Sequence, residues 1–463
     1  MSRLQVPANS NSEEVLVHSA KKAAKSGFWG AMAEYYDFGL YGTASAVIFP
    51  AVFFGAGENP RLATIASLAS FGVAYLARPL GAIVLGHLGD TWGRKKTLYL
   101  TLGLMGFATL VIGFLPSYET IGAAAGVILV VMRLIQGFSA GGEQAGSTAM
   151  TSELAPPAKR GRLVAFTMHG LLIGQLLGIA AFIPVSSNEQ FLIDFGWRIP
   201  YFAAIPLVMY ALWVRSRVDE PREVYEAIAV REGTRAHHNE TDANTTASTS
   251  KSKGSLGELF KFHWPQVLRV MAMAQYAITG VLLTNYMLNY GTTYWGWDKA
   301  TLLTLATGSL ILGVPVQPMW AALSDRIGRR PVYLISMISL VILFPLIFWS
   351  LQIESLALLI ALLVITGLVA TGGNVVQSAI YTEMFPTRLR MTGYAVSTQI
   401  GNIIVGFTPM IAAILVRPGT FGWVPVLVFT TVMMGLGVLS CFTTPETKGK
   451  DIISDLKEEV AAE

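Results

Sequence analysis

A short polar loop between two long apolar stretches occurs twice in this chain, about 230 residues apart, and a second pair of matching segments follows in the same order. Each matching segment places an acidic residue a few positions before an arginine. The matched residues are Asp90, Arg94, Glu153 and Arg160 in the first half and Asp325, Arg329, Glu383 and Arg390 in the second. Two ordered matches at nearly one offset indicate an internal repeat of half the chain. The sequence therefore predicts two similar halves.

The apolar stretches around these loops indicate a chain that lies mostly in lipid. Hydrophobic residues make up 53% of the 463 residues and charged residues 13%, whereas soluble globular chains carry about 25% charged residues. The net charge of +4 does not indicate a nucleic-acid partner, because the cations lie in short loops between apolar stretches. The expected surroundings are a lipid bilayer, with no nucleic acid bound.

Apolar stretches of about 20 residues, the length that crosses a bilayer as a helix, occur as six, a polar break, and six more. They are too long for strands and lack the alternation that strands show. The stretches lie near 27–53, 62–88, 97–116, 121–149, 163–187, 197–216, 265–290, 300–323, 332–351, 356–381, 392–416 and 421–443. The predicted fold is an all-α membrane protein with twelve transmembrane helices in two pseudo-symmetric six-helix halves.

The distribution of cations predicts the orientation of these helices. Twelve spans place both termini on one side, and most loop cations lie on that same side. Cation-rich loops are typically cytoplasmic, so both termini are predicted to be cytoplasmic. The expected segments are a cytoplasmic N-terminal segment at 1–26, the first half at 27–217, a partly disordered linker at 218–262, the second half at 263–444 and a cytoplasmic tail at 445–463.

Ionisable side chains at bilayer depth are costly, so each one calls for a reason. Glu34, Asp37 and Tyr41 share one face of the first predicted helix, and Asp37 lies near the middle of the membrane. Two carboxylates on one buried face repel each other, so at least one is expected to exchange a proton with a water-filled cavity. Asp37 is the favoured proton carrier, with Glu34 as a second candidate. The alternative is a structural ion pair with a neighbouring helix.

Two arginines are also expected at mid-membrane depth, Arg78 in the second helix and Arg133 in the fourth. The planar guanidinium offers a fork of donors that suits a carboxylate. One interpretation is that either arginine binds an anionic substrate. The other is that both only neutralise Asp37, Glu34 and Glu143, and the two interpretations are compatible.

Neutral polar side chains supply the remaining candidates for substrate contact. They are expected to line a cavity and to hydrogen-bond substrate hydroxyls, although each is individually more typical of an interhelical hydrogen bond. These residues are Tyr41, Gln136, Asn285, Asn289, Tyr290 and Gln377. No nucleotide-binding loop and no cluster of metal ligands occurs. We therefore expect no cofactor, no metal and no enzymatic activity, but transport driven by an ion gradient.

The loop Gly86…Asp90-x2-Gly93-Arg94-Lys95 and its repeat resemble the signature of the major facilitator superfamily, across essentially the whole chain. Thr91 departs from this signature, which usually has arginine there. The resemblance implies two halves that rock about a central site. It also implies that the charges of these loops latch the halves together. The implied latch residues are Asp90, Arg94, Asp325 and Arg329, with Glu153, Arg160, Glu383 and Arg390 from the second matched pair.

Within that superfamily, the chain is similar to the metabolite:proton symporters, which include shikimate, α-ketoglutarate and proline/betaine transporters, and is most similar to the shikimate type. The segments that carry this resemblance are 34–38, 78–81, 133–143, 189–192, 196–200 and 286–293. It implies proton-coupled import of a small organic acid, a shikimate-like or other monocarboxylate, by a monomer in the cytoplasmic membrane of a bacterium. The alternatives are a dicarboxylate/α-ketoglutarate symporter and a zwitterion (proline/betaine) symporter of the same fold.

Overall fold

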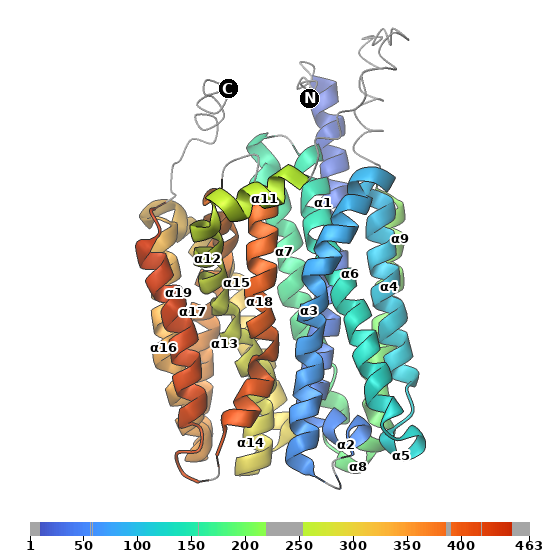
Figure 1. Cartoon of the computed structure of the whole chain (residues 1–463), viewed down its shortest axis with the longest axis vertical. Coiled ribbons are helices and arrows are strands. Elements are labelled where there is room, and N and C mark those ends of the chain that lie inside the picture. The colour runs from blue at the N-terminus through green and yellow to red at the C-terminus, as the bar shows by residue number, and fades with distance from the viewer. Residues whose placement is uncertain are drawn as a thin grey trace.

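The computed structural model describes residues 10–55, 57, 59–155, 157–218, 253–385, 390–417 and 419–446. Within these ranges the regular structure is entirely helical (Figure 1). Ten helices of the described residues are long and apolar enough to cross a membrane. Residues 1–9 of the predicted N-terminal segment 1–26, most of the predicted linker and the predicted tail beyond residue 446 lie outside the described residues.

Six long helices form the first half of the molecule. They are α1 (Ser10–Val47), α3 (Pro60–Trp92), α4 (Arg94–Phe114), α6 (Ala124–Leu154), α7 (Pro157–Ala180) and α9 (Arg198–Ser216). The short helices α2 (Phe49–Phe53), α5 (Tyr118–Ile121) and α8 (Glu189–Phe191) lie in the loops at one end of this half (Figure 1).

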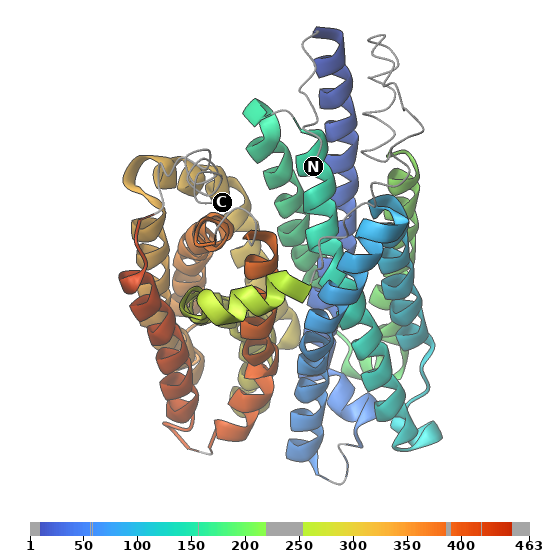
Figure 2. The ribbon, with the colours of Figure 1, turned by 45° about the horizontal axis from the view of Figure 1, so that its top comes forward.

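The second half repeats this arrangement with one interrupted span. Its first span consists of α12 (Trp264–Met273), α13 (Ala277–Val281) and α14 (Met287–Trp295), joined by short 3₁₀ and π turns. The other spans are α15 (Lys299–Ile327), α16 (Arg329–Gln352), α17 (Leu356–Glu383), α18 (Arg390–Leu415) and α19 (Val424–Thr443). Helix α11 (Lys253–Phe262) lies across one end of this half and packs against α12 and α18 (Figure 2).

The prediction of twelve transmembrane helices in two halves is confirmed. Helix α1 begins and α19 ends at the same end of the bundle, here called the terminal face (Figure 1). Helices α1 and α7 complete the twelve: α1 is not among the ten apolar spans, and α7 is represented by the shorter apolar stretch His169–Val185. Helix α1 also extends back to Ser10, well before the apolar stretch that begins near residue 27. The sequence did not predict this extension, because the first turns of the helix are polar.

Glycines allow the helices of the first half to approach closely. Helix α6 crosses α3 at Gly137, where a β-carbon would overlap the backbone carbonyl oxygen of Ala74. Helix α7 crosses α1 in the same way, with glycines placed against backbone carbonyls of α1. Those pairs are Gly170 with Phe28, Gly174 with Met32, and Gly178 with Tyr36. Small residues at such crossings give membrane helices their packing contacts, because lipid provides no hydrophobic driving force between helices.

We expect Gly137→Val to destabilise the α3–α6 crossing strongly, because its side chain would collide with backbone that has no room to move. The measurement is thermal unfolding of the purified protein in detergent. Gly103→Val is the matched control, since Gly103 lies on α4 with no heavy atom near its β-carbon position. Equal melting temperatures for the two variants would contradict this account of the crossing.

The two halves meet along a seam of described contacts near the end opposite the terminal face. Helices α3 and α18 lie side by side at its centre (Figure 1). The Asn289 side chain donates to the carbonyl of Ala46 at 2.8 Å, and Arg61 donates to the carbonyl of Ile414 at 3.1 Å. These contacts join the two halves on the side away from the chain ends.

Candidate functional site

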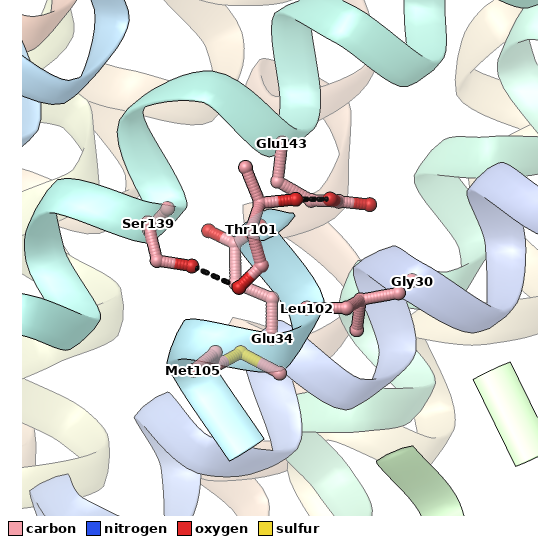
Figure 3. Close-up of a pocket in the computed structure, with 8 residues that line it drawn as sticks. Gly30, Glu34, Thr101, Leu102, Met105, Ser139 and Glu143 are labelled. Atoms are coloured by element: carbon pink, nitrogen blue, oxygen red, sulfur yellow. Dashed lines mark hydrogen bonds between the residues drawn. The ribbon is translucent and has the colours of Figure 1, made fainter. Parts of the chain in front are cut away.

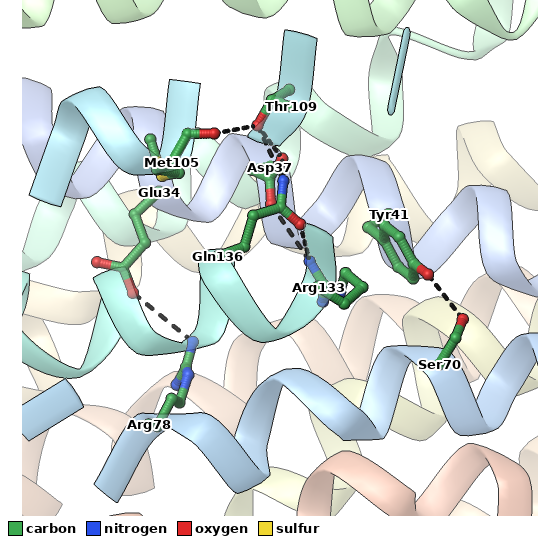
Figure 4. Close-up of polar contacts among 9 residues, drawn as sticks. All are labelled: Glu34, Asp37, Tyr41, Ser70, Arg78, Met105, Thr109, Arg133 and Gln136. Carbon is green, nitrogen blue, oxygen red and sulfur yellow. Dashed lines mark hydrogen bonds and ion pairs between the residues drawn. The ribbon is translucent and has the colours of Figure 1, made fainter. Parts of the chain in front are cut away.

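The charged side chains predicted at mid-membrane depth lie together inside the first half (Figure 4). Arg133 of α6 pairs with Asp37 of α1 at 3.3 Å, and Arg78 of α3 pairs with Glu34 of α1 at 3.6 Å. All four residues are 6% exposed or less. The sequence predicted their depth and their helices, and the structure shows which acid lies beside which base.

Asp37 is held by a complete set of hydrogen-bond donors. Its Oδ1 accepts from the Thr109 hydroxyl and from Gln136 Nε2, each at 2.7 Å, and its Oδ2 accepts from Arg133 Nη1. Gln136 completes the network, because its Oε1 accepts from the same Arg133 nitrogen at 3.0 Å. Charged hydrogen bonds of this kind offset the cost of placing a carboxylate in a low-dielectric interior. Asp37 therefore fits its surroundings as an anion.

Arg133 uses only one of its terminal nitrogens in that network. Its Nη1 contacts Asp37 and Gln136, while its Nε and Nη2 have no hydrogen-bond partner among the described residues, although the side chain is fully buried. The guanidinium carbon lies 3.8 Å from the centre of the Tyr41 ring and 5.0 Å from that of Phe38. Nε and Nη2 form one edge of the guanidinium, the edge that binds a carboxylate through two parallel hydrogen bonds.

The second ion pair is looser than the first. Glu34 contacts Arg78 through Oε1 only, at a distance too long for a hydrogen bond, and its Oε2 has no partner among the described residues. The Arg78 guanidinium lies over the rings of Phe38 and Tyr75, at 4.2 and 4.5 Å. Phe38 therefore lies against both buried guanidinium groups, a stacking arrangement that favours cations on an aromatic face.

A third buried ion pair lies nearer the terminal face and has a different partner from the one expected. Glu143 is bound by Arg215 of α9, through Nη2 at 2.5 Å and Nη1 at 3.1 Å, and by the Thr101 hydroxyl at 2.5 Å. The hypothesis that Arg78 or Arg133 neutralises Glu143 is therefore wrong. Between Glu34 and Glu143 lies a narrow gap (Figure 3). Its lining is Gly30, Glu34, Thr101, Leu102, Met105, Ser139, Ala140 and Glu143.

The sequence predicted that the mid-membrane charges face a water-filled cavity, and this exposure is not seen in the described conformation. The aromatic rings of Phe38, Tyr41 and Tyr75 cover the two guanidinium groups. The gap beside Glu34 is too narrow to admit a water molecule. In this conformation the charges are enclosed by protein, and a substrate can reach them only after the halves or the covering rings move.

Of the neutral candidates, Tyr41 and Gln136 belong to the charged cluster, whereas those of the second half do not. Asn285 lies at the seam against Gly42, and Asn289 is bound to α1 across the seam. Tyr290 stacks on the rings of Tyr286 and Tyr294 within its own half, and Gln377 donates to Asn374. The structure thus brings Asn285 and Asn289 to the interface between halves, while Tyr290 and Gln377 make their described contacts elsewhere.

Most of the predicted latch cannot be described. The side chains of Asp90, Glu153, Arg160, Asp325 and Arg390 lie outside the described part of the chain. Arg329 donates to the Ser324 hydroxyl at 2.7 Å, and its backbone amide donates to the Glu446 carboxylate at 2.9 Å. Arg94 is the first residue of α4, and Glu383 Oε2 is buried without a hydrogen-bond partner among the described residues. The latch therefore remains a prediction.

A surface ion pair connects the halves at the face opposite the terminal face. Lys299, the first residue of α15, lies 2.6 Å from Glu189, the first residue of α8. The hydrogen bond and the positive charge of Lys299 lower the pKa of Glu189 below its ordinary value. The pair therefore stabilises contact between the halves at pH values above the ordinary pKa of a glutamate, and this stabilisation is lost as the pH falls through the lowered pKa.

Acidifying this face below the pKa of Glu189 is expected to increase the separation of the halves there by a modest, salt-sensitive amount, since solvent screens exposed pairs. The measurement is the distance between spin labels at positions 187 and 304, in a Cys441→Ser background. Glu189→Gln should remove the pH dependence. A separation with the same pH response in that variant would assign the effect to another group.

Sequence reasoning missed two residues of the buried networks. Thr109 donates to Asp37, but a threonine in an apolar stretch carries no signal of such a role. Arg215 lies near the end of its apolar stretch, where an arginine ordinarily extends to the membrane surface. Its exposure of 1% shows that it turns inward. The only sequence signal was that Glu143 makes a third buried acid, whereas only two buried arginines were predicted.

Most of this chain matches a known protein family. The family model described as "Sugar (and other) transporter" matches residues 27–454. The shikimate transporter of Escherichia coli strain K12 is 34% identical over 418 residues, which cover 89% of this chain and 91% of that protein. The proline/betaine transporter of the same strain is 30% identical over 438 residues, covering 93% of this chain and 85% of that protein.

Solved structures agree on the fold. A crystal structure of a D-xylose–proton symporter superimposes with a TM-score of 0.71 at 20% identity, covering 93% of this chain and 99% of that one. The xylose transporter of Escherichia coli in a partially occluded inward-open conformation gives a TM-score of 0.70 at 19% identity, covering 94% and 100%. The chain therefore belongs to the sugar (and other) transporter family of the major facilitator superfamily, and is a multi-pass membrane transporter of a small molecule.

Proposed function

We propose that this chain is a proton-coupled symporter that imports a small organic acid, of the shikimate-like monocarboxylate type, by alternating access. The observation that carries the proposal is the buried edge of Arg133, whose Nε and Nη2 have no partner among the described residues. Buried donors without partners are costly. A substrate carboxylate that bound this edge through two parallel hydrogen bonds would remove that cost.

The charge balance of the cluster supports coupling to a proton. Glu34 and Asp37 cancel the charges of Arg78 and Arg133, so the site without substrate is neutral. Adding a monocarboxylate gives the buried site one negative charge, which costs several kcal/mol if uncompensated. One proton bound to an acid of the cluster restores neutrality. Substrate and proton therefore favour each other's binding, which is the thermodynamic requirement for symport.

The setting of the site supports alternating access. Tyr75, which covers Arg78, lies against Gly406 of α18 across the seam. Asn285 and Asn289 approach α1 from the other half. A substrate held between the halves gains contacts from both when they close, and its binding energy can shift the population of conformations. We place the chain as a monomer in a bacterial cytoplasmic membrane, with the cation-rich terminal face in the cytoplasm.

The test is uptake into proteoliposomes with an acidic exterior, using radiolabelled shikimate, with α-ketoglutarate and glycine betaine in parallel. We expect shikimate to accumulate against its gradient and a protonophore to abolish the accumulation. The shikimate transporter and the proline/betaine transporter, both similar to this chain, differ in their named substrates, so the parallel substrates matter. Accumulation of betaine but of neither acid would overturn the assignment to organic acids, and uptake insensitive to the pH gradient would overturn proton coupling.

A further inference from the structure

The two acids of α1 differ in how their carboxylates are bound. Asp37 accepts hydrogen bonds from Thr109, Gln136 and Arg133, so both of its oxygens are used. Glu34 accepts no hydrogen bond among the described residues, although it is only 3% exposed. Three charged or polar donors stabilise the anionic form of Asp37 specifically. Glu34 has one long contact with a cation, which stabilises its anionic form far less.

The groups that surround Glu34 also favour its neutral form. Arg78 of α3 is the one cation that faces Glu34 within the described residues, and its guanidinium also stacks on two aromatic rings. Glu143 of α6 lies across the narrow gap and repels an anion, although Arg215 of α9 neutralises part of that charge. Asp37 on its own helix repels it as well. Helix α4 contributes no ionisable side chain to the gap, only Thr101, Leu102 and Met105. Helix α7 also packs against α1, and its His169 adjoins Gly170, the glycine that contacts Phe28. His169 does not line the gap beside Glu34.

The geometry points to Glu34, and not Asp37, as the residue that binds and releases the coupled proton. This inference rests on the proposed function. The step adds a proton to Oε2 of Glu34, the oxygen without a partner, and converts the carboxylate into a neutral carboxylic acid. Release is the reverse step, with the proton leaving Oε2 to water once the site opens. Asp37 remains ionised throughout and fixes the position of Arg133.

Protonation of Glu34 changes what Arg78 can bind. The guanidinium of Arg78 then lacks its counter-ion and has an Nε without a partner, while it still stacks on Phe38, the ring that also contacts Arg133. A positive charge without a counter-ion is therefore left against Phe38, the ring that also contacts the arginine proposed to bind the substrate. The anion binds best when Glu34 is neutral, and the bound anion in turn retains the proton on Glu34.

Infrared difference spectroscopy tests this without any substrate. Wild-type protein in lipid would be titrated from alkaline to acidic pH while the carbonyl stretch of protonated carboxyl groups is followed. We expect a band that disappears in Glu34→Gln and persists in Asp37→Asn. Glu119→Gln, which removes an exposed loop carboxylate, is the control and should leave the band in place. Loss of the band in Asp37→Asn with retention in Glu34→Gln would overturn the inference, as would its absence from the wild type.

A second variant and a transport assay extend the infrared test of Glu34. If Glu34→Gln does not fold, Glu34→Asp should shift the titration midpoint of the band, and an unchanged midpoint would refute the role of Glu34. In proteoliposomes, Glu34→Gln should still exchange labelled for unlabelled shikimate across the membrane but should lose uphill accumulation. Wild-type protein that fails to accumulate shikimate would count against the proposed function, whereas the infrared result would still decide which acid takes up the proton.

Discussion

Replacing Arg133 with lysine is expected to weaken binding of the substrate carboxylate about 100-fold or more, with little change in folding. Lysine keeps the positive charge that balances Asp37 but lacks the planar edge formed by Nε and Nη2. Two charge-assisted hydrogen bonds would be lost, each contributing about 1.5–3 kcal/mol, and every 1.4 kcal/mol corresponds to about tenfold in affinity. The measurement is the concentration dependence of shikimate exchange in proteoliposomes.

Arg133→Ala separates the two roles of this arginine. It removes the same edge but also leaves Asp37 without its cation, so it should lower stability in addition to affinity. The lysine variant should therefore melt close to the wild type and the alanine variant well below it. An unchanged affinity in Arg133→Lys would remove this residue from the binding site.

The largest loss of stability is expected from Arg215→Met. Arg215 donates to Glu143 through two nitrogens, to the carbonyl of Leu98 and to the Ser26 hydroxyl, and so connects four helices. Removing it leaves a buried carboxylate unpaired, a change that typically costs about 3–5 kcal/mol. Thermal unfolding in detergent measures the effect.

The double variant Glu143→Gln/Arg215→Met provides the control for that experiment. It removes both charges and leaves a neutral amide that still has the Thr101 hydroxyl as a neighbour. We expect it to recover a large part of the lost stability, because the penalty comes from the unpaired charge and not from the missing side chain. A double variant as unstable as the single one would show that the packing and backbone contacts of Arg215 dominate.

The fold was largely predictable from the sequence because lipid imposes a simple length rule on apolar helices. The same rule explains why Glu34, Asp37, Arg78 and Arg133 stood out, since each breaks an otherwise apolar stretch. Their pairing was not predictable. Hydropathy gives depth along a helix but not the rotation that decides which neighbour a side chain meets.

Two features depended on three-dimensional detail that no sequence pattern records. Arg215 lies where an arginine normally reaches the surface, and only the rotation of α9 turns it toward Glu143. The difference between Asp37 and Glu34 depends on Thr109 and Gln136, which are close to one acid and not to the other. The enclosed state of the charges reflects one conformation, whereas one sequence must encode every conformation of the transport cycle.

The confinement of both mid-membrane ion pairs to the first half bears on how fast the carrier can turn over. When two halves rock as rigid bodies, contacts inside each half remain intact. The four side chains of these pairs then move with the first half as a unit, so the rocking step itself separates none of them. On the proposed alternating-access mechanism the barrier arises at the seam instead, where hydrogen bonds such as that of Asn289 to Ala46 would break. Such bonds contribute about 1 kcal/mol each, so each one adds little to the cost of opening the seam.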